Sequence, residues 1–299
     1  MKYMKLIFTI GLLLSCSISC FSFSSVYNLP APDSRLIGEK TTHKAIKGDF
    51  FQALAENYNV GFFALLAANP NVDPFLPPPD KNIVIPKQML LPYGKREGIV
   101  INLAEMRLYY YPQGEKLVYV FPVGIGRQGL ETPHVTSVIG DKRKDPIWRP
   151  TIAMRERYFA EHGKEMVKEV AAGPNNPFGK YALRIGTSEY LLHGTNKRFG
   201  IGMRASSGCI RMYAHDIEWL YNNIAVGTPI RILEQPIKIS YEPEGKMLEL
   251  HSPLTPDGVT SVKLSMNNAL RNFIGSNNKM LEKVKLLLDN PEGVVVALK

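Results

Sequence analysis

The stretch YLLHGTNKRFGIGMRASSGCIRMYAHDIEWLY, residues 190–221, decides how the rest of the chain is interpreted. Its apolar beginning predicts a strand that ends at His193, followed by a glycine-rich loop and then a helix. The loop ends in Gly208 and Cys209, just before that helix. Because glycine lets the backbone approach a bound group closely, this turn predicts a site that presents a thiol together with main-chain amides.

Cys209 is the candidate nucleophile, and His193 is its candidate proton partner. A reactive thiol needs a nearby imidazole or the positive end of a helix, and free N–H groups to stabilise an oxyanion. His193 ends an apolar strand, where its side chain can face a cleft. His215 is the rival, although its place beside Asp216 in the first turn of a helix favours a surface role. An inert buried cysteine is the alternative for Cys209.

After Pro92, the sequence contains a series of short runs rich in Val, Ile, Leu and Tyr, with turn residues between them. They predict a compact β-rich domain over residues 97–234, interrupted by a helical insertion at about 154–170 and containing a helix at 214–222. The charges on the insertion indicate solvent exposure rather than chemistry. The strand-like runs are GIVINL, RLYYY, KLVYVFPVG, YALRIG, YLLHG and TPIRIL.

Residues 41–87 have a different texture: an extended start, two brief helical patterns, a proline-rich loop and the apolar strand NIVIP. The predicted order is β-α-α-β, with Asp49 capping the first helix and Gly61 capping the second. Residues 235–299 hold another strand-like piece and an amphipathic end, NKMLEKVKLLLDN. They form a C-terminal extension of unknown role, for which we expect a structural function such as covering a sheet edge or docking on the β-rich domain.

Residues 1–24 predict an export signal, since Lys2 and Lys5 precede the apolar run LIFTIGLLL and a tail of small residues. That run is too short to be a permanent membrane span. Three outcomes stay open: cleavage near Ser24, lipoprotein processing at Cys16, and retention as an anchor in the inner membrane. Each predicts an exported, periplasmic protein.

The chain has three cysteines, and two of them, Cys16 and Cys20, lie inside the predicted signal. A mature chain would keep Cys209 alone and form no internal disulfide. In an oxidising compartment an unpaired thiol is a liability unless it is buried or used, which again draws attention to Cys209.

The formal net charge is +9, from 36 basic and 27 acidic residues, and favours an anionic partner. The basic residues are scattered, so we expect anionic wall polymer rather than nucleic acid. GIGRQG, residues 124–129, matches a dinucleotide fingerprint, but the β-branched ETPHVTSV after it predicts no helix for a pyrophosphate, so we expect no nucleotide. We also expect no cofactor and no metal, because the remaining histidines lack the spacing of metal ligands. These are His43, His134, His162 and His251.

Two resemblances follow from these motifs. Residues 41–87 resemble a LysM module, which implies binding to the N-acetylglucosamine-containing glycan of peptidoglycan; a helical subdomain that merely packs on its neighbour is the alternative. Residues 98–250 resemble the YkuD-type L,D-transpeptidase family, in its ErfK, YbiS, YcfS and YnhG branch. The second resemblance is carried by GIVINLAEMRLYYYP, FPVGIGRQGLETP, IWRPT, AAGPNNPFGKYAL, LLHGTNKRFGIGMR, SSGCIRM and VGTPIRI.

The family resemblance implies that Cys209 attacks the bond between an L-centre and D-alanine in a peptidoglycan tetrapeptide stem. His193 would accept and return the proton, held by the backbone carbonyl of Gly194. Ser207, Gly208 and Cys209 would offer backbone N–H groups to the oxyanion. Many members have Ser-His-Gly-Cys, whereas this chain has Ser-Ser-Gly-Cys at 206–209, which preserves the backbone donors and puts in doubt any contact of the missing imidazole with substrate.

Substrate contacts are expected from Ser206 and from Arg211, whose guanidinium suits a carboxylate of the stem; a structural ion pair is the alternative for Arg211. The acyl acceptor implied by this branch is a lysine-ended outer-membrane lipoprotein. Cross-linking of two diaminopimelate residues, hydrolysis by an L,D-carboxypeptidase, and a catalytically silent wall-binding protein are the alternatives.

Overall fold

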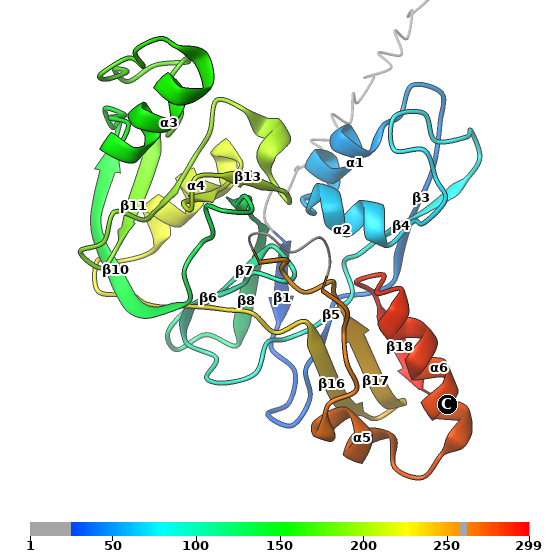
Figure 1. The fold of residues 1–299 in the computed structure, drawn as a ribbon. Coiled ribbons are helices and arrows are strands. Elements are labelled where there is room, and N and C mark those ends of the chain that lie inside the picture. The colour runs from blue at the N-terminus through cyan, green and yellow to red at the C-terminus, as the bar shows by residue number, and fades with distance from the viewer. Residues whose placement is uncertain (1–24, 257–261, 299) are drawn as a thin grey trace, which may run out of the picture.

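The computed structural model describes residues 25–256 and 262–298, so the predicted signal lies outside the described residues. Figure 1 shows a large β-rich body, with the module of residues 41–87 beside it and a separate C-terminal unit below. The fold is mainly β with few helices, as the sequence predicts.

A nine-stranded sheet forms the β-rich body. Six of its strands are the Val-, Ile-, Leu- and Tyr-rich runs that the sequence predicts, whereas the strands at 25–28, 135–144 and 210–211 are not among those runs. Neighbouring strands are antiparallel except for two parallel pairs, β6–β15 and β12–β14. In spatial order the strands are β1 (Ser25–Asn28), β8 (Leu117–Pro122), β7 (Arg107–Tyr111), β6 (Gly98–Asn102), β15 (Pro229–Leu233), β10 (Val135–Lys144), β11 (Tyr181–Ile185), β12 (Leu191–His193) and β14 (Ile210–Arg211).

Helix α4 (Ala214–Asn223) covers the end of this sheet that holds β11 and β12. Its Ile217 and Leu220 are fully buried and join a core that includes Leu183, Leu192 and Ile210. Packing of this helix therefore fixes the two strands whose ends carry His193 and Cys209. The helix ends one residue later than the sequence predicts.

The insertion between β10 and β11 is shorter as a helix than expected. Helix α3 (Ile152–His162) begins at the N-cap Thr151, whose hydroxyl accepts from the Met154 amide at 3.2 Å. It ends at Gly163, which adopts a left-handed φ of 64°. The prediction of helix to about residue 170 was wrong because this glycine terminates the helix after three turns.

The N-terminal module, residues 41–87, has the order β3 (Thr41–Lys44), α1 (Phe51–Tyr58), α2 (Phe62–Ala67) and β4 (Asn82–Ile85). Gly61 is the N-cap of α2, as predicted. Asp49 does not cap α1, because the N-cap is Phe50; the Asp49 carboxylate instead binds the Ile46 amide at 2.9 Å and the His43 ring at 2.7 Å. The N-terminal module has a hydrophobic core of its own, which includes Phe51, Leu54, Leu65 and Ile83.

The C-terminal unit, residues 236–298, has a sheet and a hydrophobic core of its own, neither of which is predicted from the sequence. The core gathers side chains from both layers of the unit, among them Leu248, Phe273 and Val284. Its elements are the antiparallel strands β16 (Ile237–Glu242), β17 (Gly245–Leu250) and β18 (Val295–Leu298) with helices α5 (Asn268–Ile274) and α6 (Asn278–Asp289).

A charged network joins this unit to the β-rich body. Lys238 on β16 lies 2.9 Å from both Glu105 and Glu249, and Arg107 on β7 lies 2.9 Å and 3.0 Å from the same two carboxylates. His251 lies 2.7 Å from Glu249. All five residues are buried, so the unit docks through buried ion pairs rather than by extending the large sheet.

The N-terminal module meets the body through a close backbone contact. The Phe63 amide donates to the Gly202 carbonyl at 3.0 Å, and a Cβ on Gly202 would lie 2.2 Å from the Gly61 Cα. Nearby, the Asn59 side chain donates to buried Asp216 at 3.3 Å. The contact between the module and the body is thus polar, and on the body side it includes Gly202, in the loop that leads to Cys209.

The remaining elements are short. β2 (Leu36–Ile37) pairs with β5 (Met89–Leu90), β9 (Ile125–Gly126) pairs with β13 (Arg204–Ser206), and η1 (Arg198–Gly200) is a single turn. Within residues 25–256 and 262–298, no helix is both long enough and apolar enough to cross a membrane.

Candidate active site

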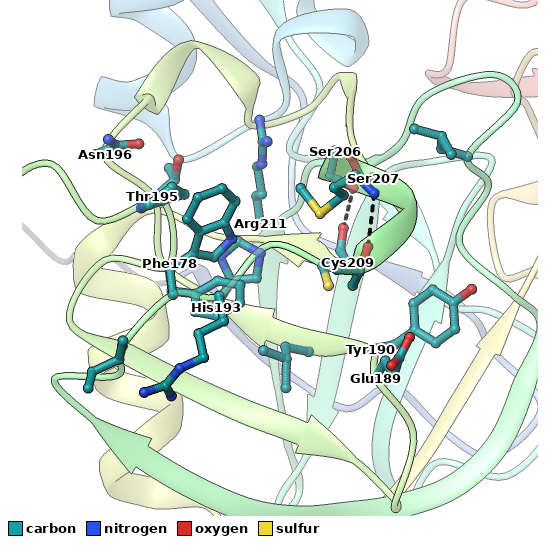
Figure 2. A pocket seen from close by; sticks show the side chains of 18 of the residues that line it. Phe178, Glu189, Tyr190, His193, Thr195, Asn196, Ser206, Ser207, Cys209 and Arg211 are labelled. Atoms are coloured by element: carbon teal, nitrogen blue, oxygen red, sulfur yellow. Dashed lines mark hydrogen bonds between the residues drawn. The ribbon is translucent and has the colours of Figure 1, made fainter. Parts of the chain in front are cut away.

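His193 and Cys209 line one cavity of about 810 Å³. Tyr190, Ser206, Ser207 and Arg211 also line it, and Figure 2 shows these side chains around the space beside the thiol. The structure therefore brings together the nucleophile and proton partner that the sequence predicts.

Strand pairing explains why these two residues are neighbours. β12 and β14 run parallel, with Leu192 opposite Ile210 and His193 opposite Arg211. Cys209 directly precedes β14, so its side chain lies level with Leu191, whose backbone contacts the thiol. His193 and Cys209 are sixteen positions apart in sequence, and the pairing of the two-residue strand β14 with β12 makes them neighbours in space.

The His193 imidazole is held in one tautomer. Its Nδ1 lies 2.5 Å from the Gly194 carbonyl oxygen, and because a carbonyl only accepts, Nδ1 carries the hydrogen. Nε2 then keeps its lone pair and can act as a base. Burial lowers the pKa of His193 to about 4, with the Gly194 hydrogen bond and Arg211 as smaller influences, so the ring is neutral at pH 7. The edge of Phe178 packs against the ring, with centroids 4.8 Å apart.

The Cys209 thiol is also held neutral. Burial raises its pKa above the ordinary value, while the Leu191 backbone and Arg211 oppose that shift. Two groups could favour the thiolate, a nearby imidazole and the positive end of a helix. The helix is set apart from the thiol, because β14 and two further residues separate Cys209 from α4. The resting pair is a neutral thiol beside a neutral imidazole.

The loop before Cys209 is braced by its own hydroxyls. Ser206 Oγ donates to the Cys209 carbonyl at 2.5 Å and accepts from the Gly208 amide at 3.2 Å. Thr132 Oγ1 donates to the Gly208 carbonyl at 2.9 Å. Gly208 has a φ of 100°, and a Cβ there would lie 2.7 Å from the Tyr190 ring. The Gly208 amide is thus already engaged, and the Ser206 hydroxyl is committed to the loop.

Arg211 extends into the cavity without a carboxylate partner. Among the residues that the structure describes, no acidic side chain lies within 4.0 Å of its guanidinium. Burial lowers the pKa of this group. The structural ion pair that was the alternative for Arg211 is absent from the described chain, which leaves a half-buried cation facing the cavity.

His215 does not belong to this cavity. It lies 3.3 Å from Asp216 on the first turn of α4, at the contact with the N-terminal module. Burial lowers its pKa. His193 is therefore the histidine that the structure places beside the thiol.

Five further cations on the cavity wall were not predicted from the sequence: Arg143, Arg149 and Arg157 from the β10–α3 region, with Arg184 and Lys197. One carboxylate, Glu189, accompanies them. Their scattered positions in sequence gave no pattern, and the charges of α3 had been assigned to solvent.

One cluster has the composition of a metal site: Glu105, Glu249 and His251, whose ligand atoms lie within 4.8 Å of one another. Lys238 and Arg107 already neutralise both carboxylates. These residues are better explained as part of the charged network than as ligands.

Comparison with known proteins gives consistent matches. A model of the YkuD-type L,D-transpeptidase catalytic domain matches residues 96–232, and a model of the L,D-transpeptidase C-terminal domain matches residues 236–298. The chain is 43% identical to the probable L,D-transpeptidase YcfS of Escherichia coli K12, over 92% of this chain and 89% of that protein. It is 41% identical to the probable L,D-transpeptidase ErfK/SrfK of Salmonella typhimurium LT2, over 93% of each.

Among solved structures, an L,D-transpeptidase from Mycobacterium smegmatis matches with a TM-score of 0.36 and 18% identity, covering 50% of this chain and 64% of that one.

Proposed function

Because the chain belongs to the YkuD-type L,D-transpeptidase family, we propose that it acts on peptidoglycan tetrapeptide stems with Cys209 as its nucleophile. Family membership gives the reaction class, an acyl transfer on wall peptide. The observation that carries the residue assignment is the His193 Nδ1 contact with Gly194, which leaves Nε2 basic in the cavity that holds the thiol.

In the first half-reaction the Cys209 thiol gives its proton to His193 Nε2 while sulfur bonds to the carbonyl carbon of the bond before D-alanine. The resulting oxyanion accepts hydrogen bonds from backbone amides. The Gly208 amide already donates to Ser206, so this role falls to Ser207 and Cys209. The carbon–nitrogen bond then breaks, His193 returns its proton to the leaving amine, and D-alanine departs from a thioester.

In the second half-reaction a neutral amine attacks the thioester and gives a proton to His193. The carbon–sulfur bond breaks, and the thiolate takes that proton back, which restores both neutral groups. The neutral resting pair suits this cycle, because a neutral His193 can accept a proton from the Cys209 thiol in the first half-reaction and from the acceptor amine in the second.

Arg211 supports recognition of a stem carboxylate. It is a half-buried guanidinium in the cavity wall, with no acidic partner within 4.0 Å among the described residues. A bidentate pair with a carboxylate would satisfy it. Ser206 acts on the reaction indirectly by bracing the loop, since its hydroxyl already bonds the backbone.

The N-terminal module, residues 41–87, is proposed to bind glycan in the manner of a LysM module, which supports an exported, periplasmic enzyme working on the wall. The acceptor proposed is the terminal lysine of an outer-membrane lipoprotein. A second diaminopimelate, which would give cross-links, and water, which would give a carboxypeptidase, are the competing acceptors.

A product assay tests the proposal. Purified protein is mixed with disaccharide tetrapeptide, with or without a lysine-ended acceptor peptide, and products are identified by mass spectrometry. We expect D-alanine release and a stem–peptide conjugate from the wild type and neither from Cys209→Ala. Dimers alone would indicate cross-linking, and tripeptide alone would indicate hydrolysis. Equal turnover by the Cys209→Ala variant would refute the proposal.

The module assignment has a separate test, in which binding to insoluble sacculi is measured by pelleting. Substitutions confined to the module should weaken pelleting while turnover of soluble stems continues. Unchanged pelleting would remove the glycan-binding assignment and leave the catalytic one intact.

A further inference from the structure

The wall of the thiol cavity carries six cationic side chains and one carboxylate, Glu189. Three of the cations form ion pairs with two acids outside the cavity lining. Arg184 and Arg143 pair with Asp141 at 2.6 Å and 2.5 Å, and Arg149 pairs with Glu169 at 3.0 Å.

The other three cations are Arg157, Lys197 and Arg211. Across the described residues, none of these three has an acidic group within 4.0 Å. Lys197 is exposed, so water screens its charge. Arg157 and Arg211 are half-buried in the cavity wall, so both are partly shielded from water and face a ligand bound in the cavity.

Arg157 and Arg211 come from different parts of the fold. Arg211 lies on β14 beside the thiol, whereas Arg157 lies in the middle of α3, in the connection between β10 and β11. One extended ligand in the cavity would therefore meet one cation near Cys209 and another on the helix.

The helix itself supplies a comparison. Arg155 stands two residues before Arg157 on α3 and has the same charge, but it is exposed and does not line the cavity. Arg157 lines the cavity from the half-buried face of α3, which it shares with Met154, whereas Arg155 lies on the exposed face.

We infer that Arg157 is a specificity-determining residue that binds a side-chain carboxylate of the donor stem, at a point remote from the bond that Cys209 cleaves. The inference rests on the proposed function, since it names the part of the tetrapeptide that this cation recognises. A tetrapeptide stem carries free carboxylates on glutamate and on diaminopimelate in addition to its terminal one. A planar guanidinium is suited to a carboxylate and loses its partner when that group becomes an amide.

The test measures binding rather than turnover, so that it does not depend on the chemistry of Cys209. In the full chain with Cys209→Ala, dissociation constants are measured for three stems by calorimetry: all carboxylates free, glutamate amidated, and diaminopimelate amidated. The measurements are repeated with Arg157→Ala added and, as the matched control, with Arg155→Ala added.

We expect one of the two amidated stems to bind about tenfold more weakly than the free stem, consistent with loss of one charged hydrogen-bonded pair. The stem that shows the loss identifies the carboxylate. Arg157→Ala should bring the free stem to the same weak binding and erase the difference between the two stems. Arg155→Ala should keep the difference.

Four results would overturn the inference: no measurable binding of the free stem, equal binding of all three stems, a preference that survives Arg157→Ala, or an equal loss with Arg155→Ala. Failure of the proposed function looks different. In that case stems bind with the expected preference, yet the protein with Cys209 intact releases no D-alanine.

Discussion

Two regions of the molecule hold charged groups partly or fully away from water. In one region the charges are paired with opposite charges, and in the other a cation has no acidic partner among the described residues. In the charged network at the C-terminal unit, Lys238 and Arg107 each contact both Glu105 and Glu249. In the thiol cavity, Arg211 is half-buried without an acidic partner in the described chain.

The network also satisfies its remaining polar atoms. Tyr109 donates to Glu105 at 2.5 Å, and the Leu90 amide donates to Glu249 at 2.6 Å. Burial of charge is tolerated when partners are complete, and removal of one partner then leaves an uncompensated buried charge. An incomplete set of partners points instead to a missing ligand, which is why the cavity, and not the network, is assigned to substrate.

Breaking the network should have the largest effect. Glu249→Ala leaves Lys238 and Arg107 buried with half of their partners, and we expect it to lower the free energy of unfolding by about 3–5 kcal/mol. Glu282→Ala is the control, because Glu282 pairs with Lys285 at the surface and should cost less than about 0.5 kcal/mol. Urea unfolding measures both. A loss below about 1 kcal/mol for Glu249→Ala would mean that the network does not hold the C-terminal unit in place.

Two arginines test the contrast directly. Arg211→Ala should lower kcat/KM for stems about 30- to 100-fold, the worth of a charged hydrogen bond of roughly 2–3 kcal/mol, while the free energy of unfolding stays unchanged or rises. Arg107→Ala, in the network, should chiefly lower stability. Steady-state kinetics and thermal unfolding of both variants separate the roles. Equal destabilisation by the two substitutions would erase the distinction between the regions.

The neutral thiol and imidazole predict an unusual pH profile. Burial lowers the pKa of His193 to about 4, so kcat/KM should keep its acid limb near pH 4 rather than near the ordinary histidine value. The pKa of Cys209 is raised, so its alkylation by iodoacetamide should keep increasing with pH beyond neutrality. An alkylation rate that levels off between about pH 5 and 7 would reveal a thiolate–imidazolium pair and contradict the neutral one.

Asp216 is a third buried charged group, and we expect its replacement to change stability only slightly. It is buried at the contact with the N-terminal module, its Oδ2 has no hydrogen-bond partner among the described residues, and burial raises its pKa well above the ordinary value. A raised carboxyl pKa favours the folded state at low pH and costs stability as pH rises above the unfolded pKa.

Asp216→Asn should therefore stabilise the protein by about 1 kcal/mol at pH 7, with the gain vanishing near pH 3. Because Asp216 does not line the cavity, turnover should be unaffected. Thermal unfolding at both pH values checks the sign. A loss of stability at pH 7 would show that this carboxylate is matched by a partner.

How much the sequence predicts differs between the site and its surroundings. His193 and Cys209 are predictable because strand, loop and glycine placement give local signals around residues 190–221. The end of α3 was misjudged because Gly163 stops the helix while the charge pattern continues beyond it.

The other features that the sequence does not predict depend on contacts between residues far apart in the chain. Glu105 and Glu249 are far apart in sequence, and nothing local to either indicates that Lys238 lies between them. The same holds for Arg157, since an exposed and a cavity-facing arginine look alike within one charged helix. Strand β14 is two residues long and has no periodicity to detect, although its pairing with β12 determines the site.

The proposed mechanism requires that the Cys209 thiol becomes acylated by a wall peptide. The direct measurement is the mass of the intact protein after mixing with disaccharide tetrapeptide, followed by mapping of the modified residue. We predict an adduct on Cys209 equal in mass to the stem without its D-alanine, absent from Cys209→Ala and slow to form in His193→Ala. An adduct on another residue, or turnover of stems with no acylation of Cys209, would contradict it.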